Sequence, residues 1–174
     1  GTPVFAGEPI LRVTAPLGEA QLVETALLST VLFQTSVASK AARVTEAAAG
    51  RPVIEFGGRR AHGADAALYA SRVAYLGGCT ATSNVEAGYR FGIPVAGTMG
   101  HSWVMAHGDE LTAFERYMAL HGENSTLLID TYDSVRAAKM IVSAGLRPAA
   151  VRIDSGDLAG VSGAVRDIFD AVPL

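Results

Sequence analysis

The amino-acid sequence predicts an α/β protein that forms part of a (β/α) barrel of parallel strands, with a short β segment and a long helix at its N-terminus. Short apolar runs alternate with helical patterns along residues 51–174, which is typical of a parallel sheet covered by helices. Polar residues and glycines follow all five expected strands. In a barrel they share one rim, whereas a doubly wound sheet concentrates them at one switch point.

The N-terminal part is expected to differ from the rest. Residues 1–16 contain β-branched residues broken by prolines and a glycine, and predict two short strands or a hairpin, the remnant of a β domain. Residues 17–50 predict a long connecting helix that ends at Gly50. This helix is apolar on nearly all sides, so we expect it to be buried or to pack against a partner.

Residues 51–174 are expected to form the barrel part, with its active-site rim. The expected strands are 52–56, 74–76, 93–96, 126–129 and 149–153, and the expected helices are 61–73, 83–91, 109–121, 134–144 and 158–172. Five strands are too few for a complete barrel. The chain also starts without Met and ends just after a helix, so both ends look like cuts and we expect a longer protein.

Composition excludes several classes of function. A net charge of −3 gives no general basic field to hold nucleic acid. The single cysteine, Cys79, excludes an intrachain disulfide and favours a reducing, cytoplasmic compartment. No apolar run approaches the roughly 20 residues of a membrane span, and no signal peptide is visible.

The segment IPVAGTMGHSWV, residues 93–104, carries the strongest chemical signal. It predicts a buried strand followed by a turn that presents Thr98, His101 and Ser102. The two glycines of the turn let the backbone approach a ligand closely. A histidine at the carboxyl end of such a strand is a candidate for catalysis. The alternative is a strand-to-helix turn in which the histidine caps or packs.

A second turn, after the first expected strand, is basic. Arg59 and Arg60 follow two glycines, and their guanidinium forks suit phosphate, pyrophosphate or carboxylate. Phe56 ends the strand and could offer a ring face to a planar ligand. A pair of surface arginines and a core phenylalanine are the alternatives.

Two further turns are acidic. Asp130, at a strand end, is the better candidate to orient an imidazole, whereas Asp133 could simply cap the next helix. The turn that begins Asp154-Ser155-Gly156 could bind sugar hydroxyls or Mg²⁺. Because side chains alternate along a strand, Arg152 is expected on the same side as Asp154.

Other catalytic motifs are absent from the sequence. It contains no phosphate-binding G-x-x-x-x-G-K-[ST] loop and no G-x-S-x-G elbow. Its four histidines have neither H-E-x-x-H nor Cys/His spacing, so we predict no dedicated metal site.

The segments EFGGRRAHG, TSNVEAGYRFGIPVAGTMGHSWV, LIDTYD and RIDSGDL, in this order, resemble the nicotinate phosphoribosyltransferase family. The opening GEPILRVTAPLGEAQLVETALL is also similar to that family, so the resemblance covers nearly the whole chain. It implies a large two-domain enzyme with an irregular α/β barrel, usually dimeric, whose site lies at the subunit interface.

The resemblance also implies a reaction. Nicotinate and phosphoribosyl pyrophosphate would form nicotinate mononucleotide and pyrophosphate with Mg²⁺, coupled to ATP hydrolysis through a phosphohistidine. The phosphorylated residue would be His101, oriented by Asp130. Phe56 would stack on the pyridine ring, and Arg59 would meet the substrate. Arg152 and Asp154 would hold the ribosyl phosphate part, where charge stabilisation carries the catalysis.

The turn at residues 80–84 bears on the choice of substrate. It offers hydroxyls and amides, including those of Ser83 and Asn84, but no carboxylate. A carboxylate there would repel nicotinate and accept a hydrogen bond from an amide. Its absence therefore favours nicotinate over nicotinamide.

The sequence differs from the family in two respects, and two alternative functions stay open. Gly100 stands where the family commonly has alanine, and the family's glycine-rich phosphate-binding loops lie after Leu174, so we expect the isolated segment to be inactive or very weak. A quinolinate-type phosphoribosyltransferase has a related barrel but uses no phosphohistidine. The other rival is a catalytically incomplete fragment that only binds or dimerises.

Overall fold

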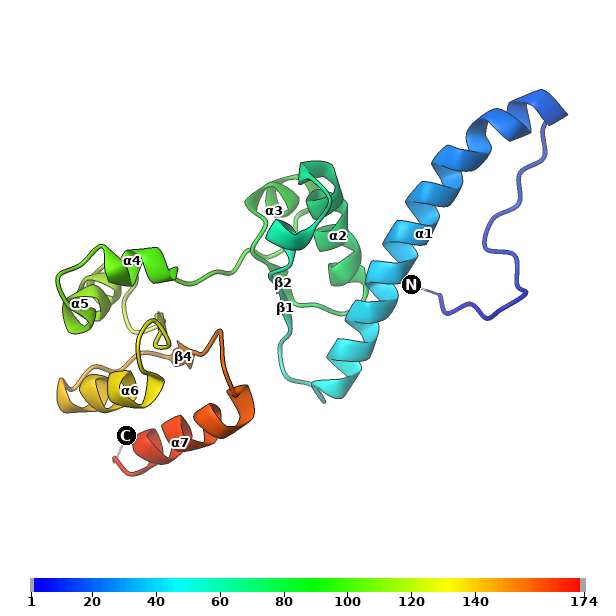
Figure 1. Ribbon diagram of the computed structural model, residues 1–174. Coiled ribbons are helices and arrows are strands. Elements are labelled where there is room, and N and C mark those ends of the chain that lie inside the picture. The colour runs from blue at the N-terminus through cyan, green and yellow to red at the C-terminus, as the bar shows by residue number, and fades with distance from the viewer. Residues whose placement is uncertain (1, 173–174) are drawn as a thin grey trace. The chain divides into compact units, whose positions relative to one another are not determined.

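The computed structural model describes residues 2–172, so Gly1, Pro173 and Leu174, which belong to the predicted terminal segments, lie outside the described residues. It has a mixed α/β fold with a long N-terminal helix and short parallel strands (Figure 1). The chain divides into two compact units, one up to Gly97 and one from Thr98 onward. The finer division into residues 1–16, 17–50 and 51–174 stays a prediction.

The described helices and strands divide between the two units. The first unit contains α1 (Leu17–Ala47), β1 (Ile54–Glu55), the 3-10 helix η1 (Gly58–Arg60), α2 (Ala64–Leu76), β2 (Ala81–Thr82) and α3 (Val85–Phe91). The second contains α4 (His101–Met105), α5 (Glu110–His121), β3 (Thr126–Leu128), α6 (Ser134–Ser143), β4 (Ala150–Arg152) and α7 (Leu158–Asp170).

The strands pair in parallel, as the sequence predicts. In the first unit β1 pairs with β2 in the register Glu55 to Thr82, and Val95 adds a single bridge to Thr82. In the second unit β3 pairs with β4 in the register Leu128 to Arg152. The described residues thus form two separate two-stranded sheets, and a barrel is not shown.

The core of the second unit fixes the end of β3. Leu127, Leu128 and Ile129 are fully buried, together with Phe114 of α5 and Ile141 of α6. A strand apolar on both faces is what a parallel sheet covered by helices requires. The residue after this buried run is Asp130, which therefore stands where the chain leaves the core.

Side chains cap the N-termini of α3, α5, α6 and α7. Oδ1 of Asn84 accepts a hydrogen bond of 3.1 Å from the Ala87 N–H at the start of α3. Asp133 caps α6 through the Arg136 N–H at 2.8 Å, and Asp109 caps α5. Asn84 and Asp133 therefore have structural roles as caps.

Helix α1 contacts the remainder of the first unit near its C-terminus. A Cβ atom placed on Gly77 would lie 2.7 Å from the Ala38 carbonyl oxygen and 2.8 Å from the Ala41 Cβ. The Thr45 hydroxyl donates a 3.0 Å hydrogen bond to the Gly77 carbonyl. Only a residue without a side chain allows α1 to pack so closely on the end of α2.

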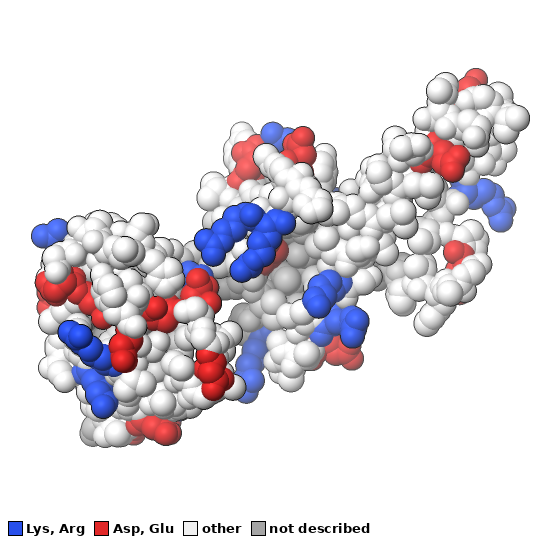
Figure 2. Space-filling view, viewed as in Figure 1, with Lys and Arg blue, Asp and Glu red and all other residues white. Residues whose placement is uncertain are grey.

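The rest of α1 is largely exposed, so burial of this helix within the chain is wrong, while the alternative, packing against a partner, stays a prediction. Within the described chain, Ala41 is its buried residue, and most of its length seen in Figure 2 carries uncharged residues. By length and composition alone α1 could cross a membrane, a test that the core helices of soluble proteins also pass. The sequence-based prediction found no such run, because it required consecutive apolar residues.

Several expected strands are absent from the described residues or shorter than predicted. Residues 2–14 form no strand, because no described segment lies beside them to complete a ladder. Residues 74–76 are the last turn of α2, whose buried positions continue to Ala74, and the strand comes later, at β2. Of residues 93–96, only Val95 pairs, through its bridge to Thr82.

Candidate functional site

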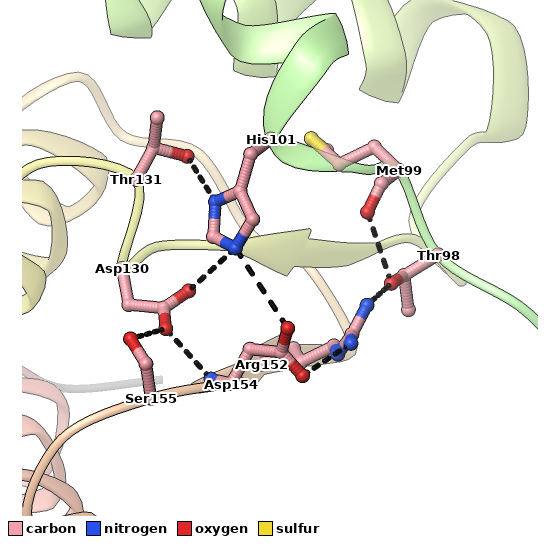
Figure 3. A network of polar contacts seen from close by, with 8 residues as sticks. All are labelled: Thr98, Met99, His101, Asp130, Thr131, Arg152, Asp154 and Ser155. Atoms are coloured by element: carbon pink, nitrogen blue, oxygen red, sulfur yellow. Dashed lines mark hydrogen bonds and ion pairs between the residues drawn. The ribbon is translucent and has the colours of Figure 1, made fainter. Parts of the chain in front are cut away.

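A histidine–carboxylate cluster lies in the second unit (Figure 3). It consists of Thr98, His101, Asp130, Thr131, Arg152, Asp154 and Ser155. These side chains come from the start of α4, the turn after β3, and the end of β4 with its following turn. The cluster therefore depends on the parallel β3–β4 pair, which places two carboxyl strand ends side by side.

His101 is the first residue of α4, not the end of a strand, which corrects the expected placement. Its Nδ1 lies 3.1 Å from the Thr131 Oγ1. Its Nε2 lies 3.7 Å from Oδ2 of Asp154 and 4.0 Å from Oδ1 of Asp130. The side chain is 40% exposed, so the ring is held between polar groups yet open to a ligand.

Asp130 is the buried member of the cluster, with a side chain only 6% exposed. Its Oδ2 accepts hydrogen bonds from the Ser155 hydroxyl at 2.7 Å and the Asp154 N–H at 2.8 Å. Burial alone would raise the pKa of Asp130, but these two hydrogen bonds and the charge of His101 outweigh it, so the pKa lies below its usual value. The group is a carboxylate at neutral pH.

Oδ1 of Asp130 has a different environment from Oδ2. Within the described residues it is buried without a hydrogen-bond partner, and it faces Nε2 of His101. A buried carboxylate oxygen beside an imidazole favours the protonated form of the facing nitrogen. Asp130 therefore lies beside the imidazole, and its orienting role stays a prediction.

Arg152 connects two sides of the cluster. One guanidinium nitrogen donates to Oδ1 of Asp154 at 2.5 Å, and the other donates to the Thr98 Oγ1 at 2.8 Å. The two charged side chains lie on the same side, as strand alternation predicts. Both are partly exposed, so together they present a cation and an anion beside the imidazole.

Ser102 and Gly156 lie next to the cluster along the chain. Ser102 is exposed in the first turn of α4. Gly156 has φ +78 in the turn between β4 and α7, a conformation that other residues rarely adopt. At Gly100, a Cβ atom would meet only the Ser102 Oγ at 3.7 Å, so the family's alanine would fit there.

The other predicted site residues belong to the first unit. Phe56 follows β1 and is half-buried, while Arg59 and Arg60 lie in η1 and are exposed. Ser83 is exposed after β2, and Asn84 caps α3. These five residues occupy two turns of one unit.

Sequence reasoning missed two residues. Thr131 follows Asp130 directly, and its hydroxyl beside a strand-end carboxylate was an available signal. Glu55 was noted only as part of a strand and as the first residue of the EFGGRRAHG segment, with no role of its own, yet its Oε2 lies 2.7 Å from the Thr82 Oγ1. The turn at residues 80–84 has no carboxylate of its own, but the carboxylate of Glu55 lies against it, which weakens the argument for nicotinate over nicotinamide.

The described residues contain no group of three or more His, Cys, Asp or Glu arranged to hold a metal ion. The oxygen donors of the cluster are Asp130 and Asp154. Mg²⁺ is commonly bound through one or two carboxylates together with substrate phosphates. Asp130 is buried and Asp154 is partly exposed, so the carboxylate that fits a magnesium ion shared with a phosphorylated substrate is that of Asp154.

Comparison with known proteins gives a consistent match. Residues 52–172 match the model of the nicotinate phosphoribosyltransferase (NAPRTase) family. The chain is 46% identical over 180 residues to nicotinate phosphoribosyltransferase pncB2 of Mycobacterium tuberculosis, covering 100% of this chain and 39% of that protein. It is 48% identical over 177 residues to the nicotinate phosphoribosyltransferase of Bacillus subtilis, covering 98% of this chain and 36% of that one.

Solved structures agree with the sequence matches. The crystal structure of human nicotinic acid phosphoribosyltransferase superposes with a TM-score of 0.80 at 32% identity, covering 97% of this chain and 45% of the human one. Nicotinate-nucleotide pyrophosphorylase from Pyrococcus furiosus gives a TM-score of 0.71 at 29% identity, over 80% of this chain and 38% of the other. The chain spans less than half the length of each of these relatives, and it belongs to the nicotinate phosphoribosyltransferase family.

Proposed function

We propose that the protein containing this chain is a nicotinate phosphoribosyltransferase of NAD salvage, which forms nicotinate mononucleotide from nicotinate and phosphoribosyl pyrophosphate and couples the reaction to ATP hydrolysis. The observation that carries the proposal is the placement of His101 between the Thr131 hydroxyl and two carboxylates. The surrounding segments match the family, whose named members carry out this chemistry.

His101 is the proposed phosphoryl acceptor, and its Nδ1 is the attacking atom. The carboxylates of Asp130 and Asp154 face Nε2 and favour a proton there, which leaves a lone pair on Nδ1. At rest this lone pair accepts from the Thr131 hydroxyl; once the hydroxyl turns aside, the lone pair attacks the γ-phosphorus of ATP, and ADP leaves with the electrons of the broken P–O bond. Nε2 is the poorer acceptor, because a phosphoryl group there would meet two negative charges.

Each unit is proposed to supply its own set of substrate-binding residues. Arg152 and Asp154 would hold the ribosyl phosphate part, with Thr98, Ser102, Ser155 and Gly156 around it. Phe56, Arg59 and Arg60, with Ser83 and Asn84, would bind nicotinate. A guanidinium–carboxylate contact is stronger than a neutral hydrogen bond, which suits Arg59 to the nicotinate carboxylate.

In the transfer step, the pyridine nitrogen of nicotinate attacks C1 of the ribose while the C1–O bond to pyrophosphate breaks. Pyrophosphate leaves with the bonding electrons, and positive charge develops on the ribose ring. Asp154, which is partly exposed and beside Arg152, would stabilise this charge, while Arg152 would hold the phosphate oxygens. Asp154 would also hold a Mg²⁺ ion, which would supply positive charge for the departing pyrophosphate.

The wider architecture is also part of the proposal. The short parallel strands would be part of an irregular (β/α) barrel. The parallel pairing within each sheet and the match to the human structure support an α/β fold of this kind. We propose a cytoplasmic homodimer, in keeping with the single buried cysteine and the exposed apolar residues of α1.

The test uses the full-length protein. Wild type incubated with γ-labelled ATP should gain acid-labile phosphate, and His101→Ala should not, whereas His121→Ala, at the exposed end of α5, should label normally. Nicotinate and phosphoribosyl pyrophosphate should give nicotinate mononucleotide at a higher kcat/KM than nicotinamide or quinolinate gives its product.

Three outcomes would contradict the proposal. Turnover of quinolinate without acid-labile phosphate would favour the quinolinate-type reading. Preference for nicotinamide would reverse the substrate assignment. A full-length protein that binds neither nicotinate nor phosphoribosyl pyrophosphate would favour a binding or dimerisation module. The isolated 174 residues should show little or no turnover.

A further inference from the structure

The Glu55 carboxylate, at the end of β1, contacts three different segments of the first unit. Its Oε1 accepts a hydrogen bond from the Gly57 N–H in the turn after β1. Its Oε2 accepts from the Ser71 hydroxyl of α2 at 2.9 Å and from the Thr82 hydroxyl at the end of β2 at 2.7 Å. No motif identified in the sequence explains this convergence.

The partners of Glu55 are buried hydroxyls. Ser71 and Thr82 each have 0% exposure, and Glu55 itself is partly buried. Taking a carboxylate out of water is costly unless donors satisfy it. Three donors from three segments therefore hold the Glu55 side chain in one conformation, and their hydrogen bonds stabilise its carboxylate.

The contacts of Glu55 extend into both turns that carry candidate substrate-binding residues. Gly57 follows Phe56 and begins the turn to Arg59, and a Cβ atom on Gly57 would lie only 3.0 Å from Oε1 of Glu55. On the other side, the Thr82 Oγ1 accepts a 3.0 Å hydrogen bond from the Asn84 N–H.

The backbone of Glu55 strengthens the second connection. Its carbonyl oxygen accepts a hydrogen bond of 2.9 Å from the Ser83 N–H. One residue thus fixes the turn after β1 through its side chain and the turn after β2 through both its side chain and its backbone.

We propose that Glu55 is a positioning residue for the nicotinate-binding turns, acting through Gly57 and Thr82 and not by contact with substrate. This inference rests on the proposed function, because it assigns those turns to nicotinate. Loss of the Glu55 carboxylate would displace Phe56 and Arg59, so the KM for nicotinate would rise while phosphorylation of His101, in the other unit, would continue.

Glu55→Gln tests this in the full-length protein. A glutamine offers one acceptor oxygen where three donors converge, so we expect the KM for nicotinate to rise about tenfold, the loss of a hydrogen bond to a charged group. kcat should stay within about twofold, and labelling of His101 by ATP should be unchanged. Glu110→Gln is the matched control, a buried carboxylate in the second unit, and should leave the KM unchanged.

Thr82 provides a milder pair of variants. Thr82→Val removes the hydroxyl that joins Glu55 to the Asn84 N–H, and should raise the KM for nicotinate, whereas Thr82→Ser keeps the hydroxyl and should keep the KM near the wild-type value.

If Glu55→Gln and Thr82→Val fold and keep a wild-type KM, or lower kcat with no change in KM, the positioning role is wrong. A wild type that neither labels His101 nor turns over nicotinate would overturn the proposed function instead.

Discussion

The Ser155 hydroxyl donates a hydrogen bond of 2.7 Å to Oδ2 of Asp130, and so ties the turn after β4 to the end of the buried run that follows β3. The Asp154 N–H donates to the same oxygen. Because one carboxylate oxygen is occupied by these donors, the other is turned toward His101. The orientation of Asp130 toward the imidazole is therefore set by two residues that lie more than twenty positions away in sequence.

Asp130→Asn should change stability in a pH-dependent way. The folded pKa of Asp130 lies below the unfolded value of about 3.9, so its stabilising contribution is present above about pH 3.9 and is lost as pH falls through the folded pKa. At pH 7 the variant should be less stable than wild type by about 1.5–3 kcal/mol, the value of a hydrogen bond to a charged group.

Urea unfolding of both proteins at pH 7 and at about pH 3 measures this difference, which should shrink in acid. Asp167→Asn, an exposed carboxylate on α7, is the control and should show no such dependence. An Asp130→Asn deficit that stays constant between the two pH values would show that the charge of Asp130 is not what stabilises the fold.

Thr131→Val should weaken phosphorylation of His101. The change keeps the shape of the side chain but removes the hydroxyl that lies 3.1 Å from Nδ1, so the ring loses its orientation toward ATP. A neutral hydrogen bond is worth about 0.5–1.5 kcal/mol, so the rate of acid-labile labelling should fall roughly two- to tenfold. Thr112→Val, which removes a threonine hydroxyl from the Asp109 cap of α5, should label as wild type does.

Sequence patterns were reliable where local physics decides the structure. Asp133 and Asn84 cap helices because short polar side chains reach the free N–H groups of the first turn. Arg152 and Asp154 share a side because strand geometry alternates side chains. These relationships span only a few residues, so one sequence contains all the information that they need.

Tertiary relationships were harder to predict. The strand expected at residues 74–76 is helical because Ala74 belongs to the buried face of α2, while Tyr75 and Leu76 are exposed in its last turn. The hydrogen bonds of the Glu55 carboxylate come from Ser71 and Thr82, which are distant in sequence and are brought to it only by the fold. His101 could equally end a strand or begin a helix, since Gly97 and Gly100 permit either path, and the structure shows that it begins α4.

Glu110→Gln should stabilise the protein at alkaline pH. Burial is the main cause that raises the pKa of Glu110, against the opposing charge of Arg136, and Oε1 of Glu110 is buried without a hydrogen-bond partner in the described chain. An acid with a raised folded pKa makes the fold less stable as pH rises from the unfolded value of about 4.3 through the folded one.

Removing that charge should therefore raise stability by about 1 kcal/mol at pH 8, with no gain near pH 4, where the wild-type side chain is protonated. Thermal unfolding at the two pH values gives the comparison. A variant that is less stable than wild type at pH 8 would mean that the carboxylate has favourable contacts in the folded state that outweigh its burial.

Gly77→Ala should loosen the contact between α1 and α2. Gly77 has an ordinary negative φ, so alanine brings no backbone strain, but its Cβ would lie 2.7 Å from the Ala38 carbonyl oxygen. Overpacking of this kind typically costs about 1–3 kcal/mol. Gly18→Ala, in the first turn of α1 with nothing within 4 Å, should cost nothing.

Amide exchange of the full-length protein should show faster exchange around Thr45 in the Gly77 variant, since the hydrogen bond from Thr45 to Gly77 spans this contact. Equal exchange in both variants would mean that α1 is not held at Gly77.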